Sequence, residues 1–128
     1  MDVRLKRAYE PAAVTDGYRV LVDRLWPRGL SKQRARLDAW ERDLAPSKEL
    51  RQWFGHEPRR FAEFRRRYLD ELRRQRPLLG ELRRRARREP ITLVYAAHDD
   101  EHNDAVVLAD VLRRGLPRQP ERETNAAR

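Results

Sequence analysis

Apolar and charged residues alternate in two stretches near the start of the chain, which is the pattern of short β-strands with one buried face. The first stretch runs from Val3 to Lys6 and the second from Tyr18 to Asp23. Trp26 and Pro27 end the second pattern, because proline fixes φ and has no N–H for a strand ladder. A further strand, apolar apart from one threonine, is predicted from Ile91 to Tyr95.

Between the last two of these strands, apolar residues recur every three or four positions, which predicts helices. Ser47 is the expected N-cap of a short helix that stops at Gly55. A long helix is predicted to begin at Pro58 and to end by Pro77, and another helix follows and closes before Pro90.

Three other segments complete the predicted elements. Leu30 to Ala35 fits a single helical turn capped by Ser31. Leu37 to Leu44 is ambiguous, because its residues fit one face of a helix and also one face of a strand. Asp104 to Arg114 is amphipathic and predicts the last helix, with Asn103 as its N-cap.

Strands separated by helices predict an α/β fold, a single compact domain with a small, mostly parallel sheet flanked by helices. A chain of 128 residues has the usual size of one domain, which we expect over residues 1–115. Residues 116–128 are polar, contain two prolines and show no apolar period, so we expect a mostly disordered tail there.

The chain is basic and rich in arginine, with a formal net charge of +9. Of its 30 basic residues 27 are Arg, and residues 51–90 hold 14 Arg against 6 acids, a balance of +8. This excess predicts a surface that binds an anionic partner such as nucleic acid. The alternative is the codon habit of a GC-rich genome, which places Arg wherever a surface cation is needed.

Several classes of function are excluded or disfavoured by composition. The chain has no cysteine, which excludes disulfides, thiolate nucleophiles and cysteine zinc sites. With three histidines, neither a metal site nor a cofactor is expected. The longest apolar run, Ile91 to Ala97, is far shorter than the roughly 20 residues that span a bilayer, so we expect a cytoplasmic protein without a membrane partner.

Two loops that follow predicted strands carry the candidate chemistry, Asp23 to Gly29 and His98 to Asn103. In parallel α/β sheets, ligands bind beyond the carboxyl ends of the strands, where such loops meet. Guanidinium groups and a helix N-terminus suit an anion. The expected ligand-binding residues are Arg24, Trp26, Arg28, Ser47 and Asn103, and the candidates for an acid or base are Asp23, Asp99 and His102.

These residues also have structural interpretations, which the sequence leaves open. Arg24 and Arg28 could pair with a nearby aspartate and hold the loops together instead of binding a ligand. Trp26 could cover the core instead of stacking on a ring. The loop histidines could be solvated, and Asn103 could serve only as a helix cap.

The chain resembles the YeaO-like branch of the family of domain of unknown function 488 in three motifs, V-D-R-L-W-P-R-G-L-S-K, L-A-P-S-K-E-L-R-Q-W-F-G-H and D-D-E-H-N-D-A-V-V-L. The resemblance covers about residues 2–115 and implies a compact α/β domain without an established activity. It favours a strand within Leu37 to Asp43, where longer relatives carry one. Some relatives have Cys-His-Arg where this chain has Asn103, Asp104 and Ala105, which implies that chemistry needing that cysteine is absent here.

Two functions therefore remain open from the sequence. The first is a module that binds a phosphate-bearing ligand or nucleic acid at the carboxyl edge of the sheet, which the basic balance and the strand-end arginines support. The second is a small cysteine-free enzyme that acts on a phosphorylated or nucleobase-containing metabolite through an Asp or His acid or base. In both cases the expected partner is anionic.

Overall fold

Four strands form one sheet in the order β1-β4-β2-β3, and every neighbouring pair is parallel. The computed structural model describes residues 1–118, and the strands are β1 (Val3–Arg7), β2 (Tyr18–Leu21), β3 (Ala39–Trp40) and β4 (Ile91–Tyr95). Val3 and Tyr18 both align with Ile91, so β1, β2 and β4 end at the same edge. The predicted α/β fold with a small parallel sheet is confirmed.

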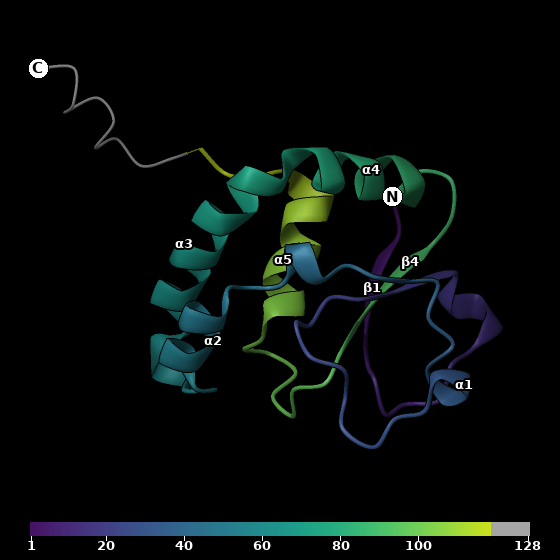
Figure 1. Ribbon diagram of the computed structural model, residues 1–128. Helices are drawn as coiled ribbons and strands as arrows, with labels where there is room; N and C mark the ends of the chain where they lie inside the picture. The colour runs from purple at the N-terminus through teal and green to yellow at the C-terminus, as the bar shows by residue number, and fades with distance from the viewer. Residues whose placement is uncertain (119–128) are drawn as a thin grey trace, which may run out of the picture.

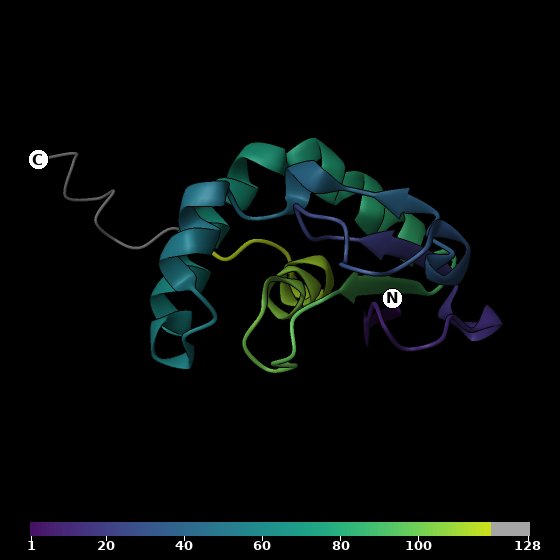
Figure 2. The same cartoon turned by 60° about the horizontal axis from the view of Figure 1, so that its bottom comes forward.

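Within the described residues the α-helices are α1 (Lys32–Ala35), α2 (Lys48–Phe54), α3 (Phe61–Leu72), α4 (Arg76–Ala86) and α5 (Asp104–Arg114). Helix α5 packs directly on β1 and β4, and both α3 and α4 pack against α5. Figure 1 shows α5 between the sheet and α3, with α4 crossing its end. Figure 2 shows the same arrangement after a turn of 60°. None of these helices is long and apolar enough to cross a membrane.

The long helix predicted to begin at Pro58 and to end by Pro77 corresponds to α3, which ends at Leu72. A 3-10 turn (Pro58–Arg60) leads into α3, and a second 3-10 turn (Arg73–Gln75) joins α3 to α4. Pro77 lies in the first turn of α4 instead of marking the end of the preceding helix. The reason is that the first turn leaves its N–H groups unpaired in any case, so proline costs little there.

The ambiguous segment after α1 contains both kinds of structure. Ala39 and Trp40 form the short edge strand β3 beside β2, and a 3-10 turn (Arg42–Leu44) follows. Ser31 caps α1 as predicted, since its hydroxyl accepts from the Arg34 N–H. β2 ends at Leu21, two residues earlier than predicted, although the Val22 N–H still donates to the Val94 carbonyl.

The main core lies between one face of the sheet and the helices. Its largest fully buried side chains include Phe64 and Tyr68 of α3, and the Tyr68 hydroxyl donates to the Leu44 carbonyl. Trp53 is only half-buried at the edge of this core, with the Arg67 guanidinium 4.3 Å from its ring centroid. The helical spacing of Leu50, Trp53 and Phe54 predicts a buried Trp53, which is wrong because the ring lies at the edge of the core.

A smaller core covers the opposite face of the sheet. Leu21 and Val94 pack there against Ala35 of α1, with Trp26 and Trp40 partly buried beside them. The two indole rings meet edge to face at 5.5 Å between centroids. Trp26 therefore serves as a cover for this part of the core, and its Nε1–H donates to the Leu30 carbonyl at 2.6 Å.

The tail is predicted to begin at residue 116, and the described residues end at residue 118. Of the tail, only residues 116–118 are described. Leu116 packs partly against the main core, and the Pro117 carbonyl accepts from Arg73 at 2.8 Å. The rest of the predicted tail, 119–128, lies outside the described residues.

Candidate functional site

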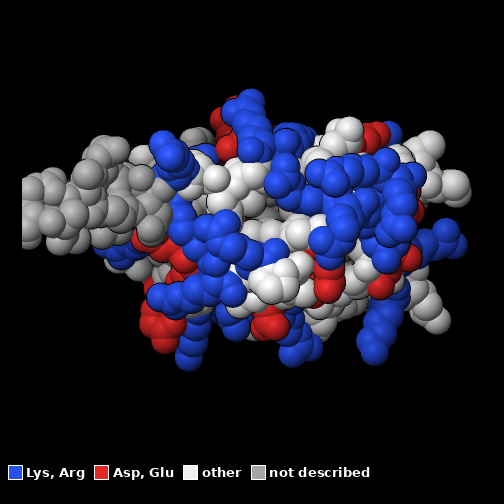
Figure 3. Space-filling view, turned by 90° about the horizontal axis from the view of Figure 1, so that it is seen from above, with Lys and Arg blue, Asp and Glu red and all other residues white. Residues whose placement is uncertain are grey.

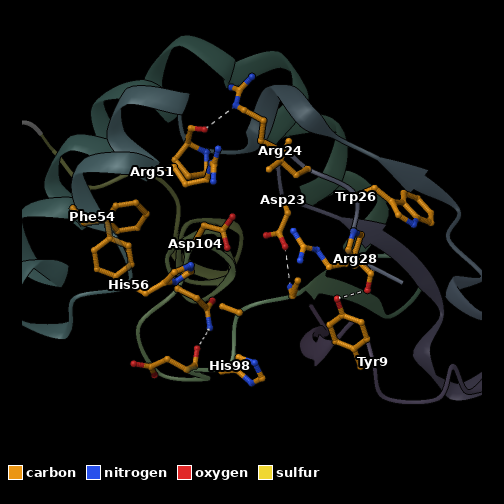
Figure 4. A pocket seen from close by; sticks show the side chains of 18 residues that line it. Tyr9, Asp23, Arg24, Trp26, Arg28, Arg51, Phe54, His56, His98 and Asp104 are labelled. Carbon is orange, nitrogen blue, oxygen red and sulfur yellow. Dashed lines mark hydrogen bonds between the residues drawn. The ribbon is translucent and has the colours of Figure 1, made fainter. Parts of the chain in front are cut away.

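A cavity of about 820 Å³ opens at the carboxyl edge of the sheet. It lies where the loop after β2, the loop after β4, the end of α2 and the start of α5 meet, as Figure 4 shows. Its aromatic wall includes Tyr9, Trp26, Phe54 and Phe64, and its charged side chains include Asp23, Arg24, Arg28, Arg51, His56, His98, Asp99 and Asp104. The two loops predicted to meet at this edge therefore do so.

Two carboxyl groups, those of Asp23 and Asp104, lie side by side in this cavity (Figure 4). An oxygen of Asp23 accepts the Ala96 N–H at 2.8 Å, and an oxygen of Asp104 accepts the Ala105 N–H, also at 2.8 Å. The two carboxyl groups are close enough for each to influence the pKa of the other. Each carboxyl group is thus held by the backbone at the end of a strand or the start of a helix.

The proximity of the two acids changes their protonation. Burial raises the pKa of Asp104 well above its ordinary value, and the negative charge of Asp23 raises it further. Burial also raises the pKa of Asp23, while the hydrogen bonds from Asp104 and Ala96 act in the opposite direction. The two acids therefore titrate as one coupled pair, which retains a proton more readily than two separate aspartates would.

The arginines of the cavity have few partners within the protein. Arg24 donates from Nε to the Pro46 carbonyl at 3.1 Å, which ties the loop after β2 to the start of α2. The Nε of Arg51 on α2 is buried and has no hydrogen-bond partner in the part of the chain that the structure describes. Arg28 is exposed, and its side chain reaches into the cavity in Figure 4. Within residues 1–118 none of the three forms an ion pair.

His56 reaches the cavity from an unusual backbone conformation. Gly55 ends α2 with a φ of 54°, and His56 follows with a φ of 58°. Glycine adopts this left-handed region freely, whereas a residue with a Cβ does so at a cost of about 1–2 kcal/mol. Two left-handed residues in succession turn the chain sharply, and the imidazole of His56 then lines the cavity.

The loop after β4 is held by its own hydrogen bonds. The Asp99 carboxylate accepts the N–H groups of Glu101 and His102, at 2.9 and 3.0 Å, and lies 2.9 Å from His102 Nδ1. These bonds hold the pKa of Asp99 below its ordinary value. His102 does not line the cavity, and its ring meets Phe61 edge to face. The Asp99 carboxylate therefore holds the loop after β4 in its conformation, and His102 contacts that carboxylate from outside the lining of the cavity.

The remaining predicted residues are placed as follows. Asn103 caps α5, since its Oδ1 accepts the Val106 N–H at 2.9 Å, and it lines the cavity. Ser47 caps α2 and donates its hydroxyl to Glu71 at 2.6 Å, but it does not line the cavity. The cavity thus brings together Asp23, Arg24, Trp26, Arg28, Asp99 and Asn103, whereas Ser47 and His102 lie outside its lining.

Three charged residues of the cavity were missed from the sequence: Arg51, His56 and Asp104. The sequence predicted Asp104 only as the first residue of a helix, and it showed Arg51 only as one of many arginines on predicted helices. A signal did exist for His56, because a residue directly after a helix-ending glycine often continues the turn in which that glycine sits.

The chain matches the family described as the inactive DUF488-N3 subclade over residues 2–128. It belongs to this family. The uncharacterized protein YeaO of Escherichia coli (strain K12) is 46% identical over 113 residues, which cover 88% of this chain and 98% of YeaO. The uncharacterized protein Rv3073c of Mycobacterium tuberculosis (strain ATCC 25618 / H37Rv) is 46% identical over 110 residues, 86% of this chain and 92% of that protein. No solved structure gives a significant match.

These matches confirm the resemblance to the YeaO-like branch that the three sequence motifs indicated. The DUF488-N3 subclade member described here carries the second and third motifs at the cavity itself, through Arg51, His56 and Asp104. The first motif supplies Asp23, Arg24 and Arg28. The residues that carry the family resemblance and the residues that line the cavity are therefore largely the same.

Proposed function

We propose that the cavity binds a phosphate-bearing small molecule, with its phosphate received by the guanidinium groups of Arg24, Arg28 and Arg51. The observation that supports this most directly is an imbalance of partners. The acids Asp23, Asp99 and Asp104 are hydrogen-bonded within the protein, whereas the arginines form no ion pair in the described part of the chain. The charged groups that remain available to a ligand are therefore the guanidinium groups, which are positive.

The protonated state of Asp104 adds to this imbalance. Were both acids ionised, Asp23 and Asp104 would place two negative charges beside the arginines. With one proton retained, the pair contributes a single negative charge, and the cavity tolerates an anion better. Guanidinium groups bind phosphate through parallel N–H donors, which suits several arginines around one anion.

The aromatic wall of the cavity indicates the chemistry of the part of the ligand that carries the phosphate. Phe54 and Phe64 line the cavity beside the arginines, and Tyr9 closes one side, with its hydroxyl donating to the Arg28 carbonyl at 2.9 Å. Most of a small ligand's surface is usually buried against such apolar and aromatic groups, with a few polar groups fixing its orientation. We therefore expect an organic phosphate to bind better than inorganic phosphate.

A small enzyme is the alternative function. It is favoured by the position of Asp104 in the cavity together with its raised pKa, because a carboxylic acid that keeps its proton can act as a general acid. The description of the matching subclade as inactive supports binding instead. Incubation with a panel of phosphorylated metabolites, followed by phosphorus NMR, distinguishes the two: binding alone leaves the spectrum of each compound chemically unchanged.

Thermal unfolding with added ligands tests the proposed function. A ligand that binds only the folded protein raises the melting temperature, so a nucleoside monophosphate should do so and the matching nucleoside much less. Arg51→Gln should reduce the shift, whereas Arg34→Gln, on exposed α1, should leave it intact. Absence of any shift with inorganic phosphate, sugar phosphates and nucleotides would contradict the proposal.

A further inference from the structure

The arginines of the middle helices fall into two groups that differ in their partners. Those of α3, and Arg73 directly after it, pair with carboxylates: Arg65 pairs with Asp110, Arg66 and Arg67 with Glu63, and Arg73 with Asp70. Arg84, Arg87 and Arg88, at the end of α4, form no ion pair and donate no side-chain hydrogen bond within residues 1–118. Arg59, Arg74 and Arg76 lack such partners within these residues too, but Arg84, Arg87 and Arg88 are the three that lie together in one groove.

These free arginines line a groove of about 610 Å³, here called the α4 groove, whose lining is Tyr18, Glu41, Glu81, Leu82, Arg84, Arg85, Arg87 and Arg88. Four arginines stand there against two glutamates, a balance of +2. Tyr18 begins β2, so the groove lies near the amino edge of the sheet and shares no residue with the cavity at the carboxyl edge. Figure 3, seen from above, shows Lys and Arg side chains crowded over this face of the molecule.

Aromatic rings support two guanidinium groups in and beside the α4 groove. Arg85 lies over the Tyr18 ring at 3.9 Å from its centroid, and it also pairs with Glu89 at 2.9 Å. Arg42, next to Glu41, lies over the Trp40 ring at 3.7 Å. A guanidinium held flat on a ring keeps its N–H groups at the edge, where they remain available to an anion.

We propose that the α4 groove binds the phosphate backbone of a nucleic acid without reading its sequence. Arg84, Arg87 and Arg88 are spaced at i, i+3 and i+4, which places them on one side of the helix end. Arginine rows on a concave surface are the usual electrostatic footprint of a phosphate backbone. A codon habit alone would not explain why three arginines without a carboxylate partner in the described chain line the same groove.

Two other anionic partners fit the α4 groove less well. An anionic membrane usually requires apolar side chains that enter the lipid beside the basic ones. The exposed large apolar residues of the described chain are Met1, Tyr9, Val14 and Leu25, none of which is on α4. A single small anion would need the cations to converge, whereas here the four arginines follow one another along the end of α4.

Binding of a fluorescent DNA duplex of about 20 base pairs, followed by anisotropy at several salt concentrations, tests this inference. Three phosphate contacts predict a log–log salt slope of about −2.7, so that affinity falls roughly 40-fold when salt rises fourfold. The variant R84Q/R87Q/R88Q should bind at least tenfold more weakly at low salt, with a correspondingly shallower slope. A duplex of different sequence should behave in the same way.

The matched control is R34Q/R59Q/R114Q, which changes the net charge equally at exposed positions outside the groove. It should retain nearly all of the affinity. Equal losses in both triple variants, or no binding of the parent at low salt, would overturn the proposal. So would groove-dependent binding to vesicles containing phosphatidylserine without binding to the duplex. Circular dichroism checks that each variant is folded. If R84Q/R87Q/R88Q unfolds, R87Q/R88Q replaces it, and its expected loss of affinity for the duplex is intermediate.

Discussion

The carboxyl group of Asp104, the first residue of α5, lies beside that of Asp23, which follows β2, in the cavity at the carboxyl edge of the sheet (Figure 4). The two residues are 81 positions apart in the chain, the difference between 104 and 23. Their proximity joins the sheet to the last helix and places the pair of acids in the same cavity as Arg51 and His56.

The first prediction concerns the pH dependence of stability. The pKa of Asp104 is raised in the folded protein, so above about pH 4, where an unfolded aspartate ionises, the folded state retains more protons than the unfolded state. This group therefore contributes stability that is lost as pH rises through its folded pKa. Asp104→Asn keeps a hydrogen-bond donor and cannot ionise.

Urea unfolding of the parent and of Asp104→Asn, measured from pH 5 to about pH 9, checks this. The free energy of unfolding of the variant should increase relative to that of the parent as pH rises. Asp100→Asn, an exposed position in the loop after β4, is the control and should run parallel to the parent. If Asp104→Asn also runs parallel, Asp104 is ionised in the folded protein.

The second prediction separates the roles of the cavity arginines. Arg28→Ala should weaken binding of the organic phosphate by roughly 1.5–3 kcal/mol, the scale of a hydrogen bond to a charged group. It should leave unfolding nearly unchanged, because the side chain is exposed and has no ion-pair partner within the described residues. Arg24→Ala should weaken binding and also reduce stability, since it removes the bond to the Pro46 carbonyl. Calorimetric titration together with thermal melts measures both quantities.

The third prediction concerns the left-handed backbone at His56. His56→Gly should be as stable as the parent or up to about 1 kcal/mol more stable, because glycine adopts a positive φ without a Cβ penalty. His56→Val should be less stable than either, since a branched side chain fits this region poorly. His56→Asn tolerates the conformation and lacks the imidazole, so weaker ligand binding with unchanged stability would assign the imidazole to the site. Equal stability of all three variants would show that the turn is not strained.

The fourth prediction compares two aromatic residues of the main core. Phe64 is buried and stacks on Phe54 at 4.4 Å between centroids, so Phe64→Ala should cost about 3–5 kcal/mol of unfolding free energy. Trp53 is half-buried beneath Arg67, so Trp53→Ala should cost clearly less. Chemical denaturation of both variants provides the comparison. A larger loss of unfolding free energy for Trp53→Ala than for Phe64→Ala would contradict this ranking.

Much of the fold could be predicted because the deciding signals are local. The strand Ile91–Tyr95 and the helix Asp104–Arg114 have the predicted bounds, since an apolar run and an amphipathic period are properties of neighbouring residues. The caps at Ser31, Ser47 and Asn103 were predicted for the same reason. Two helices were predicted on either side of Pro77, but the boundary lies at residues 73–75, because a proline permits a helix start as readily as it marks an end.

The candidate site could be predicted only in part. The sequence by itself determined that Asp23, Arg24 and Arg28 follow a strand and that Asp99 and Asn103 follow another, and parallel strands bring such loops to one edge. Only the tertiary structure decided that α2 lies against the same edge and adds Arg51 and His56.

Which arginines form ion pairs with acids was also decided only by the tertiary structure. A sequence shows how many arginines and acids a chain has, but whether two of them meet depends on packing between distant elements. Arg65 of α3 is neutralised by Asp110 of α5, whereas Arg87 and Arg88 meet no acid in the described chain. Ion pairs act over a few ångströms, so the same residue type is a structural tie on one helix and a free cation on the next.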